Sequence, residues 1–397
     1  MKLRRSVFPI VLGLGVCVSE AQVPPGYRIV QLMYTPDQFD RTPSINNCGQ
    51  VVFCTRFDPN DWNTGEIMLY EDGKFIRLTN DNVRDDAPDI NDAGTIVWHR
   101  GIGPNGTAEI VMLKDGELKQ ITDDAWDDQV PRINQAGQIA WYQRTGAGCA
   151  SSESNVMFFD GETIHTIVAD GESNQWVRLN DYDELVWTRF NFCQSPWTSE
   201  QMLYSGGVIT QLTAGQVSSA SPDINNAGDV AWFHRVPPDY HHAIDVWRAG
   251  VTTRLTEWGS GVRIGNNGDV FFDRWHDDTQ TWQVWLYREG TYFQLSDDPF
   301  WNYVFDLNDR GELVWHSGDP FTEDIRALLR YSAGDLNCDG SVNTLDIGPF
   351  VTALIDPQGY AAEHPSCDAI LADTNGDGQA NVLDINGFID LIMRGSD

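Results

Sequence analysis

The chain has 397 residues, of which 58 are acidic and 26 are basic, and its formal net charge is −32 at pH 7. A charge of this sign and size repels phosphate backbones and anionic lipid, so it argues against nucleic acid or a membrane surface as a partner. Part of the acidity lies in the C-terminal loops described below, and the rest is interpreted as a solvated surface, since it is spread over turns such as NDNVRDD and TDDAWDD.

Residues 1–21 have the pattern of a cleaved secretory signal. A basic start precedes a short apolar run and the sequence Ser19-Glu20-Ala21. We expect the mature protein to begin near Gln22, to be secreted or held at the cell surface, and to carry a formal charge of −34. No other stretch approaches the roughly 20 apolar residues of a membrane span.

Residues 22–333 contain one phrase seven times, from PSINNCGQVVF to FDLNDRGELVW. The copies are spaced 40 to 46 residues apart, and each period holds short β-rich runs separated by turn residues. Repeats of this period and chemistry are typical of propeller blades. We therefore predict a mainly β fold, a seven-bladed β-propeller with four-stranded blades. The anchor residues of the phrases are Asn46, Asn91, Asn134, Asn180, Asn225, Gly265 and Asn308.

Two further patterns extend this prediction. The seventh repeat ends near Tyr331 without a fourth strand, and the N-terminal run YRIVQL supplies one, so residues 27–32 are expected to pair with residues 327–331 and close the ring. An aromatic residue follows each anchor by seven positions, and we expect these rings to pack between blades rather than to bind a ligand. They are Phe53, Trp98, Trp141, Trp187, Trp232, Phe272 and Trp315.

The repeated phrases resemble the TolB-type, WD40-like propeller repeats, in which a P-x-x-S-P-D-G turn precedes an apolar strand and a later L-T. Here that turn reads I-N-x-x-G. The resemblance spans about residues 26 to 333 and implies the fold. It implies little about function, because such propellers act as scaffolds, binders and occasionally enzymes.

A ligand of the propeller is expected on the face where the loops between blades gather around the channel. Aromatic rings beside carboxylates suit sugars, although acidic turns and scattered tryptophans are also ordinary in a chain of this composition. The expected face carries Asp85, Asp86, Asp123, Asp124, Trp126, Asp127, Asp128, Trp176, Trp258, Phe300 and Trp301, with Trp62, Trp197, Tyr240 and Trp275 on longer loops.

A ring of balanced charge, with three acids and three bases, is expected near the channel, two residues before each anchor. Ion pairs between blades are favoured over an ionic ligand as its role. The positions are Ser44, Asp89, Arg132, Arg178, Asp223, Arg263 and Asp306.

Six cysteines remain after signal cleavage, and an even count in an exported chain permits disulfides. Cys149 and Cys193 sit in corresponding loops of adjacent repeats and are the expected pair. Cys48 and Cys54 belong to one hairpin, and the sequence leaves open whether they pair.

The segment 334–397 contains two copies of one loop, DLNCDGSVNTLD and DTNGDGQANVLD. Each offers oxygen ligands at alternate positions with glycine at position six, which is the pattern of a twelve-residue calcium loop. We predict two Ca²⁺ ions. The expected ligands are Asp335, Asn337, Asp339, Ser341, Asn343 and Asp346 in the first loop, and Asp373, Asn375, Asp377, Gln379, Asn381 and Asp384 in the second.

Position twelve is Asp rather than the Glu of an EF-hand, and one helical stretch follows each loop. This arrangement resembles the type I dockerin module over about residues 334 to 395. The resemblance implies a calcium-dependent partner that is a cohesin-like or other cell-surface protein, and a disulfide between Cys338 and Cys367. Positions ten and eleven are Thr344-Leu345 and Val382-Leu383, where cohesin-binding dockerins have small hydroxyl residues.

Our leading functional prediction is a secreted, non-catalytic binding or scaffold protein with a carbohydrate or peptide ligand on the propeller and attachment through the tail. The alternatives are a polysaccharide-active hydrolase or lyase carried by the same tail, and a structural surface-layer component. A role of calcium in folding alone is a further alternative for the loops. No nucleophile, acid–base pair or catalytic metal motif is apparent in the sequence, so no catalytic residue is assigned.

Overall fold

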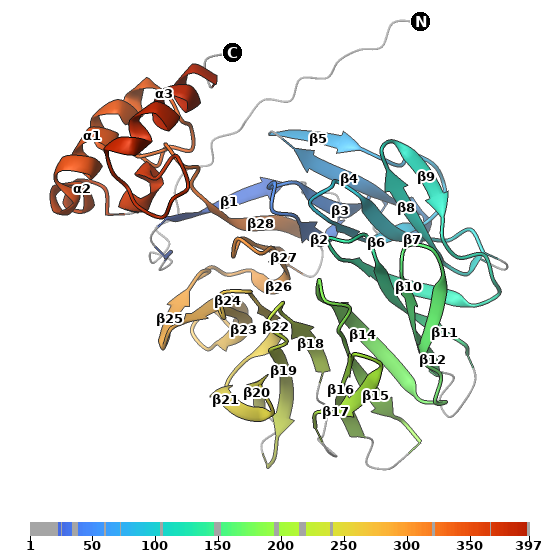
Figure 1. Cartoon of the computed structure of the whole chain (residues 1–397). Helices are drawn as coiled ribbons and strands as arrows, with labels where there is room; N and C mark the ends of the chain where they lie inside the picture. Colours follow the sequence, from blue (N-terminus) through green and yellow to red (C-terminus); the bar gives the residue numbers. More distant parts are fainter. Residues whose placement is uncertain are drawn as a thin grey trace, which may run out of the picture.

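The structure, a computed structural model, describes residues 23–24, 26–33, 39–58, 61–71, 73–103, 106–146, 152–193, 198–213, 220–238, 241–319, 322–365 and 367–394. The fold is mainly β and propeller-like, with a small helical region at the C-terminus (Figure 1). The strands follow one another in antiparallel sets of four that surround a common centre.

The first half of the propeller-like region runs to β17. Its strands are β1 (Tyr27–Met33), β2 (Phe39–Ile45), β3 (Val51–Arg56), β4 (Gly65–Glu71), β5 (Lys74–Arg77), β6 (Asp85–Ile90), β7 (Ile96–Arg100), β8 (Glu109–Lys114), β9 (Glu117–Gln120), β10 (Asp127–Ile133), β11 (Ile139–Arg144), β12 (Ser154–Phe159), β13 (Ile164–Val168), β14 (Ser173–Leu179), β15 (Leu185–Asn191), β16 (Thr198–Ser205) and β17 (Val208–Gln211).

The second half runs from β18 to β28. Its strands are β18 (Ala220–Ile224), β19 (Val230–Val236), β20 (His241–Arg248), β21 (Val251–Thr256), β22 (Ser260–Ile264), β23 (Val270–His276), β24 (Thr281–Arg288), β25 (Thr291–Gln294), β26 (Trp301–Leu307), β27 (Leu313–Asp319) and β28 (Thr322–Arg330).

The N-terminal strand completes the last set, as the sequence predicted. β1 pairs antiparallel with β28, with Tyr27 opposite Arg330 and Val30 opposite Ala327. The first and last sets also adjoin, because β2 lies against β26, β27 and β28. Pairing of the two ends of this region removes an edge strand that would otherwise be open to other chains.

The I-N-x-x-G phrase works through the side chain of its asparagine. In the second set, Asn91 accepts the backbone N–H of Thr95 with Oδ1 at 3.0 Å, which closes the turn between β6 and β7. Its Nδ2 donates to the backbone carbonyl of Asn134 in the next set at 3.1 Å. Gly94, the last residue of the phrase, has a φ of +71°, which favours glycine at that position.

These asparagine contacts run from set to set around the channel. Each anchor amide donates to the next anchor's carbonyl, and Asn308 donates to the carbonyl of Asn46 at 2.9 Å, so the chain of contacts returns to its start. The single anchor without an amide is Gly265, which accepts from Asn225 at 3.0 Å. The other members of the series are Asn46 to Asn91, Asn134 to Asn180 and Asn180 to Asn225.

The aromatic residues that follow the anchors are buried between sets, as predicted. All seven are at most 1 % exposed. Trp98, for example, belongs to a core cluster that also contains Val52 and Ile67 of the preceding set. The indole N–H groups of Trp98, Trp141, Trp187 and Trp315 donate to a side chain thirteen residues earlier, namely Asp85, Asp128, Asn174 and Asn302.

The C-terminal region contains α1 (Ile347–Ile355), α2 (Pro357–Glu363) and α3 (Ile385–Arg394). Helices α1 and α3 each follow one of the repeated loops, as predicted. Helix α2 was not anticipated, and it forms within the connector because Pro357 occupies its first turn and Asp356 accepts the N–H of Gly359 as its N-cap.

The asparagine contacts lead to a first prediction. Replacing Asn91 with Ala removes the donor to Asn134 and leaves the N–H of Thr95 without its acceptor, so the free energy of unfolding should fall by about 2 kcal/mol. Thr210→Ala on the exposed strand β17 is the control and should change it by less than about 0.5 kcal/mol. Equal denaturant midpoints for the two variants would contradict a structural role for the anchor amide.

A second prediction compares two buried tryptophans. The indole N–H of Trp187 donates to Asn174 at 2.9 Å, whereas that of Trp232 has no acceptor in the described structure. Phenylalanine at either position removes similar apolar area, but only Trp187→Phe leaves the buried Asn174 oxygen without its partner. Thermal or chemical denaturation should therefore show Trp187→Phe to be less stable than Trp232→Phe by about 1–2 kcal/mol. A larger loss at Trp232 would refute the explanation.

Candidate functional site

The first C-terminal loop, residues 335–346, is organised by its first and last residues. Asp335 and Asp346 are 1 % and 0 % exposed. The carboxylate of Asp335 accepts the backbone N–H groups of Asp339 and Gly340 at 3.1 and 3.0 Å. Asp346 accepts the N–H of Asn337 at 2.9 Å. The φ of Gly340 is +92°, so the glycine allows the sharp turn at position six.

The second loop, residues 373–384, repeats this arrangement. Asp373 accepts the N–H groups of Asp377 and Gly378 at 3.1 and 2.7 Å. Asp384 is fully buried and accepts the N–H of Asn375 at 3.0 Å. Two loops with different intervening residues thus share the same backbone hydrogen bonds and a buried acid at position twelve, whereas the acid at position one is buried in the first loop and half-buried in the second.

The donor set of the loops fits a calcium ion. Besides the aspartates, Asn343 and Asn381 donate to the backbone carbonyls of Ser341 and Gln379 at 3.3 and 3.1 Å, which brings positions seven and nine of each loop together. Carboxylate, amide and carbonyl oxygens are the ligands that calcium prefers. Among the described residues, groups of three acids whose oxygens lie within 4.8 Å of one another occur in the propeller-like region and not in these loops, so ion binding would require the loop side chains to turn inward.

A small core supports the two loops. Phe350 of α1 and Phe388 of α3 stack with ring centroids 3.9 Å apart. Tyr360 of α2 donates its hydroxyl to the carbonyl of Leu336 at 2.9 Å. The predicted disulfide between Cys338 and Cys367 is present, with a Cα–Cα distance of 5.9 Å, and it ties the first loop to the connector.

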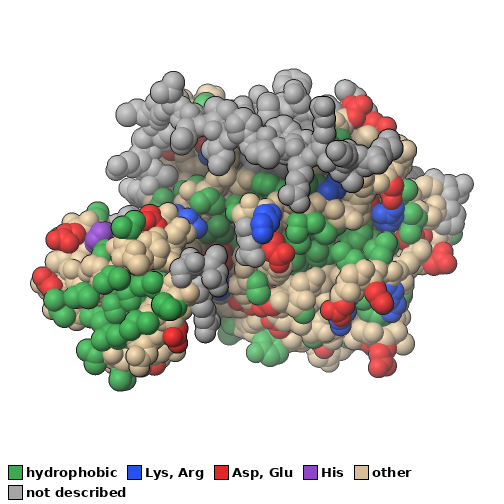
Figure 2. Space-filling model, turned by 90° about the horizontal axis from the view of Figure 1, so that it is seen from above, with side chains coloured by type: hydrophobic (Ala, Val, Ile, Leu, Met, Phe, Trp, Pro, Cys, Tyr) green, Lys and Arg blue, Asp and Glu red, His purple; other side chains and the backbone are tan. Residues whose placement is uncertain are grey.

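The surface of this C-terminal region is unusually apolar. Figure 2 shows hydrophobic side chains gathered over the helical region. Ten large apolar side chains here are between 42 % and 78 % exposed. They come from both copies of the loop and helix and from the connector. They are Leu345, Ile347, Val351, Ile355, Ile370, Val382, Leu383, Ile385, Ile389 and Met393.

The predicted ring of charges lines the central channel, and its members pair with one another. Arg132 lies 3.4 Å from Asp89, and Arg178 lies 3.9 Å from Asp223 and 3.7 Å from Asp306. Burial and the nearby positive charges of other arginines lower the pKa of Arg178 to about 9. The favoured interpretation, ion pairs between sets, is therefore confirmed.

The central cavity lies on the side of the anchor turns, opposite the loops where a ligand was expected. It has a volume of about 140 Å³ and is lined by anchors such as Asn134 and Asn180 and by the ring of charges. The first strand of each set runs from these loops toward its I-N-x-x-G turn, and the charged side chains line the channel close to that turn. The ligand expected at the face of the loops between sets stays a prediction, because several of these loops lie outside the described residues.

That face does present aromatic side chains at its periphery. Six of the predicted rings are 39 % to 53 % exposed, whereas Asp85, Asp86 and Asp128 are buried. Trp197 and Tyr240 lie outside the described residues, as does the side chain of Trp62. The exposed rings are Trp126, Trp176, Trp258, Trp275, Phe300 and Trp301.

Two of these rings line an open pocket of about 450 Å³ between β20 and β24. Trp275 meets Trp282 edge to face with centroids 5.7 Å apart, and Trp258 lies 4.7 Å from the ring of His241. Arg274 and Asp277 supply charged groups at the same pocket. Sequence reasoning missed Trp282, whose contact with Trp275 follows from their pairing across β23 and β24.

The remaining cysteines behave differently from one another. Cys193 is disulfide-bonded, and its predicted partner Cys149 lies outside the described residues. Cys48 and Cys54 do not pair with each other: Cys48 is exposed, and Cys54 is buried with its thiol donating to the carbonyl of Asp85 at 3.2 Å. Burial raises the pKa of the Cys54 thiol well above its usual value.

Residues 1–22, which include the predicted signal, lie outside the described residues. No helix in the described ranges combines the length and the apolarity that a membrane crossing requires.

The chain is similar to solved β-propeller structures. The β-propeller domain of the Trilobed protease from Pyrococcus furiosus matches with a TM-score of 0.56 and 12 % identity, covering 74 % of this chain and 97 % of that one. Pyrococcus horikoshii acylaminoacyl peptidase matches with a TM-score of 0.53 and 16 % identity, covering 72 % of this chain and 50 % of that one. A Mycobacterium tuberculosis puromycin-hydrolyzing peptidase matches with a TM-score of 0.55 and 10 % identity, covering 77 % of this chain and 55 % of that one.

At these identities the likeness shows the propeller fold alone, and the chain spans about half the length of the two peptidases. No protein-family model matches the chain, and no curated protein matches it. The dockerin and EF-hand resemblances of the tail therefore have no support from these comparisons, and enzyme status stays open.

A buried histidine gives the propeller-like region a defined response to acid. His99 is 2 % exposed, and its Nδ1 accepts the backbone N–H of Val130 at 3.3 Å while Arg84 lies 3.2 Å from its Nε2. Burial, with a smaller contribution from the charge of Arg84, lowers the pKa of His99 from 6.5 to about 4. Protonation would also abolish the acceptor for Val130.

We predict that His99 contributes to acid unfolding. Because its pKa is lower in the folded state than in the unfolded chain, its contribution is complete above pH 6.5 and is lost as the pH falls through 4, to a limit of about 3 kcal/mol. His99→Asn keeps an acceptor near the position of Nδ1 without titrating. Urea denaturation at several pH values should show that the wild type loses more stability than His99→Asn between pH 6.5 and 4, and parallel curves would exclude this role.

Proposed function

We propose that this chain is a secreted or cell-surface binding protein in which a closed, seven-bladed propeller recognises a ligand and a calcium-loaded, dockerin-like tail docks on another protein. The single observation that carries the proposal is the apolar surface of the tail, formed by equivalent positions of two loop-and-helix copies. Exposed contiguous apolar surface of this kind marks interaction sites on soluble proteins.

The tail joins calcium binding to docking in this proposal. Leu345 and Leu383, at position eleven of the two loops, are each 68 % exposed. Both stand directly beside the buried acids Asp346 and Asp384, so ordering of the loops by calcium would fix the apolar side chains in place. When bound, each ion would neutralise the aspartates of its loop and stabilise the shape of the loop.

The proposed partner is a cohesin-like protein with an apolar docking surface. Hydroxyl side chains, which cohesin-binding dockerins carry at positions ten and eleven, are largely replaced here by Leu345, Val382 and Leu383. The partner should therefore present more apolar surface at these positions than a cellulosomal cohesin does. The comparisons do not favour the hydrolase or lyase alternative over this binding role.

For the propeller, we propose a carbohydrate ligand at the pocket of Trp258, Trp275 and Trp282. Exposed indole rings bind the apolar faces of sugars, and the adjacent Arg274 and Asp277 suit hydroxyl groups. The pocket lies away from the central channel, whose charged side chains already satisfy one another.

The docking proposal predicts a calcium-dependent interaction of the full mature chain. Used as bait against surface and secreted proteins of its source, the chain should retain a cohesin-like protein in calcium and release it in excess chelator. The double variant Leu345→Asp/Leu383→Asp should lose that partner, because charge would be buried at the interface, while the chain binds calcium as before.

Val208→Asp is the matched control, since Val208 is 63 % exposed on β17 in the propeller-like region, and it should retain the partner. Capture that is indifferent to chelator, or to charge at Leu345 and Leu383, would refute docking through this face. Calcium-dependent folding of the tail without any partner would leave the ion a structural role only and would also refute it.

A further inference from the structure

Three positions recur at the contact between neighbouring sets of strands. The first position lies on the third strand of a set. The second position comes 15 residues later, in the loop that leads to the next set. The third position comes four residues after the second, on the first strand of that next set. Four of these triplets lie wholly within the described residues. They are Glu66, Asp81 and Asp85; Glu109, Asp124 and Asp128; Asn155, Asp170 and Asn174; and Gln283, Asp298 and Asn302.

The first triplet holds three acids that two arginines neutralise. Arg100 forms an ion pair with Asp85 at 2.9 Å and another with Asp81. Arg77 lies 3.1 Å from Glu66. The carboxylate oxygens meet within 4.8 Å of one another, and the guanidinium groups compensate for their repulsion.

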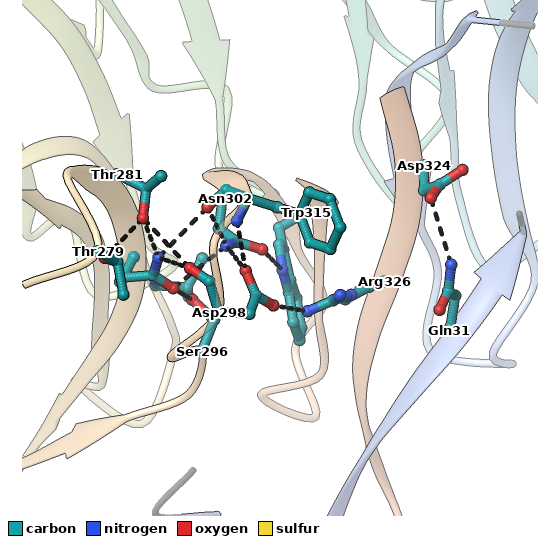
Figure 3. Close-up of polar contacts among 12 residues, drawn as sticks. Gln31, Thr279, Thr281, Ser296, Asp298, Asn302, Trp315, Asp324 and Arg326 are labelled. Carbon is teal, nitrogen blue, oxygen red and sulfur yellow. Dashed lines mark hydrogen bonds and ion pairs between the residues drawn. The ribbon is translucent and has the colours of Figure 1, made fainter. Parts of the chain in front are cut away.

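The last triplet is neutralised in another way (Figure 3). Its outer positions are amides, and Asn302 donates to the remaining acid, Asp298, at 2.9 Å and to Gln283 at 3.2 Å. Arg326 pairs with Asp298 from the adjacent strand. Trp315 donates its indole N–H to Asn302, as Trp98 does to Asp85.

The third triplet also contains a single acid. Asn174 donates to Asp170 at 2.9 Å, and Arg189 lies 3.7 Å from the same carboxylate. Arg189 follows Asn174 by 15 residues, as Arg100 follows Asp85, so this arginine occupies the equivalent position. Three of the four triplets therefore combine their acids with at least one arginine.

The triplet of Glu109, Asp124 and Asp128 has three acids and no such partner. Gln143 occupies the position equivalent to Arg100 and donates to Asp124 at 3.0 Å. Gln120 occupies the position equivalent to Arg77 and donates to a backbone carbonyl. No arginine, lysine or histidine in the described chain forms an ion pair with any of the three acids. Their oxygens nevertheless lie within 4.8 Å of one another.

Two oxygen atoms of this triplet are buried without a partner. Glu109 and Asp128 are both 0 % exposed. Glu109 accepts the hydroxyl of Thr122 on one oxygen, and Asp128 accepts the indole N–H of Trp141 on one oxygen. Their other oxygens, Oε1 of Glu109 and Oδ2 of Asp128, have no hydrogen-bond donor in the described structure. A buried, unpaired carboxylate oxygen is costly unless a cation is present.

We propose that Glu109, Asp124 and Asp128 bind a calcium ion, which replaces the arginines of the equivalent triplet and joins β8 to β10. All donors are oxygens, and a span of up to 4.8 Å between them fits an ion with ligands at about 2.4 Å. Asp124 is exposed, so water can complete the coordination. Nothing in this site depends on the loops of the tail.

A proton is the competing occupant. Burial, with the nearby charges of Asp124 and Glu109, raises the pKa of Asp128 to about 7, and burial also raises that of Glu109. A protonated Asp128 would relieve the repulsion without a metal. The two occupants differ in a measurable way, because only the ion brings a luminescent lanthanide next to Trp141.

The test uses terbium, which replaces calcium in oxygen-ligand sites, and excitation through tryptophan in the full mature chain. The tail, residues 334–397, contains no tryptophan, so its loops do not interfere strongly with this signal. We expect tryptophan-sensitised terbium emission that calcium displaces and that Glu109→Gln/Asp128→Asn abolishes. Asp124→Asn, at an exposed position, should weaken terbium binding by roughly tenfold or more, because ligand charge sets the affinity.

Reciprocal variants keep the test independent of folding. Gln143→Arg restores the arginine of the first triplet and should abolish the emission while the protein stays folded, as judged by its circular dichroism. Arg100→Gln with Arg77→Gln should create a second such site beside Trp98 and raise the number of bound ions by one. No sensitised emission in the wild type, or emission unchanged by Gln143→Arg and by Glu109→Gln/Asp128→Asn, would overturn the proposal and leave the proton as the occupant.

Discussion

The structure depends on one bifunctional side chain, the anchor asparagine of the I-N-x-x-G turn. Its oxygen accepts a backbone N–H of its own turn, and its amide donates to the backbone of the next set, as Asn91 does toward Thr95 and Asn134. Aspartate lacks the donor and serine has too short a reach, so asparagine is the residue that meets both demands. Each set whose anchor is asparagine is thereby joined to its neighbour by a hydrogen bond of 2.9 to 3.2 Å.

The exception at Gly265 supports this interpretation. There Asn267 accepts the N–H of Asp269 at 3.1 Å and takes over the closure of the turn. The contact with the following set passes to Asn266, whose side-chain amide donates to Asp309. The anchor can be lost at one position because neighbouring amides supply both functions, which implies that the geometry of the turn, rather than the residue itself, is what the fold requires.

Much of this fold was predictable because its signals are local and repeated. The anchors, the buried aromatic residues and the pairing of β1 with β28 all follow from patterns of fixed spacing, and the contact of Cys338 with Cys367 follows from the resemblance of the tail. The pocket of Trp275 and Trp282 was not predictable, because it depends on register between two strands. The triplet of Glu109 was missed for a related reason: its members are 15 and four residues apart, and only the folded sets bring them together.

The position of the central cavity shows a different limit of the sequence. The ring of Asp89, Arg132 and Arg178 was correctly placed at the channel, yet the loops seemed the natural entrance. Arginine side chains line the cavity and pair with acids of other sets, and composition alone does not reveal at which end of the channel the cavity lies. A sequence pattern predicts which residues face the channel. It does not predict the volume of the cavity among them, because that volume depends on the conformation of each side chain.

The C-terminal tail is much smaller than the propeller-like region, and its size limits how much apolar area it can bury. A module of this length has too small an apolar core to be stable by burial alone, and such modules usually add disulfides or metal ions. Here the stacked rings of Phe350 and Phe388 and the disulfide at Cys338 supply part of that stability. Yet Leu345, Leu383 and eight other large apolar side chains stay at the surface instead of enlarging the core. Exposed apolar side chains add no stability to the isolated module, although a module of this size depends on buried apolar area. This is the strongest physical reason to expect that another protein covers them.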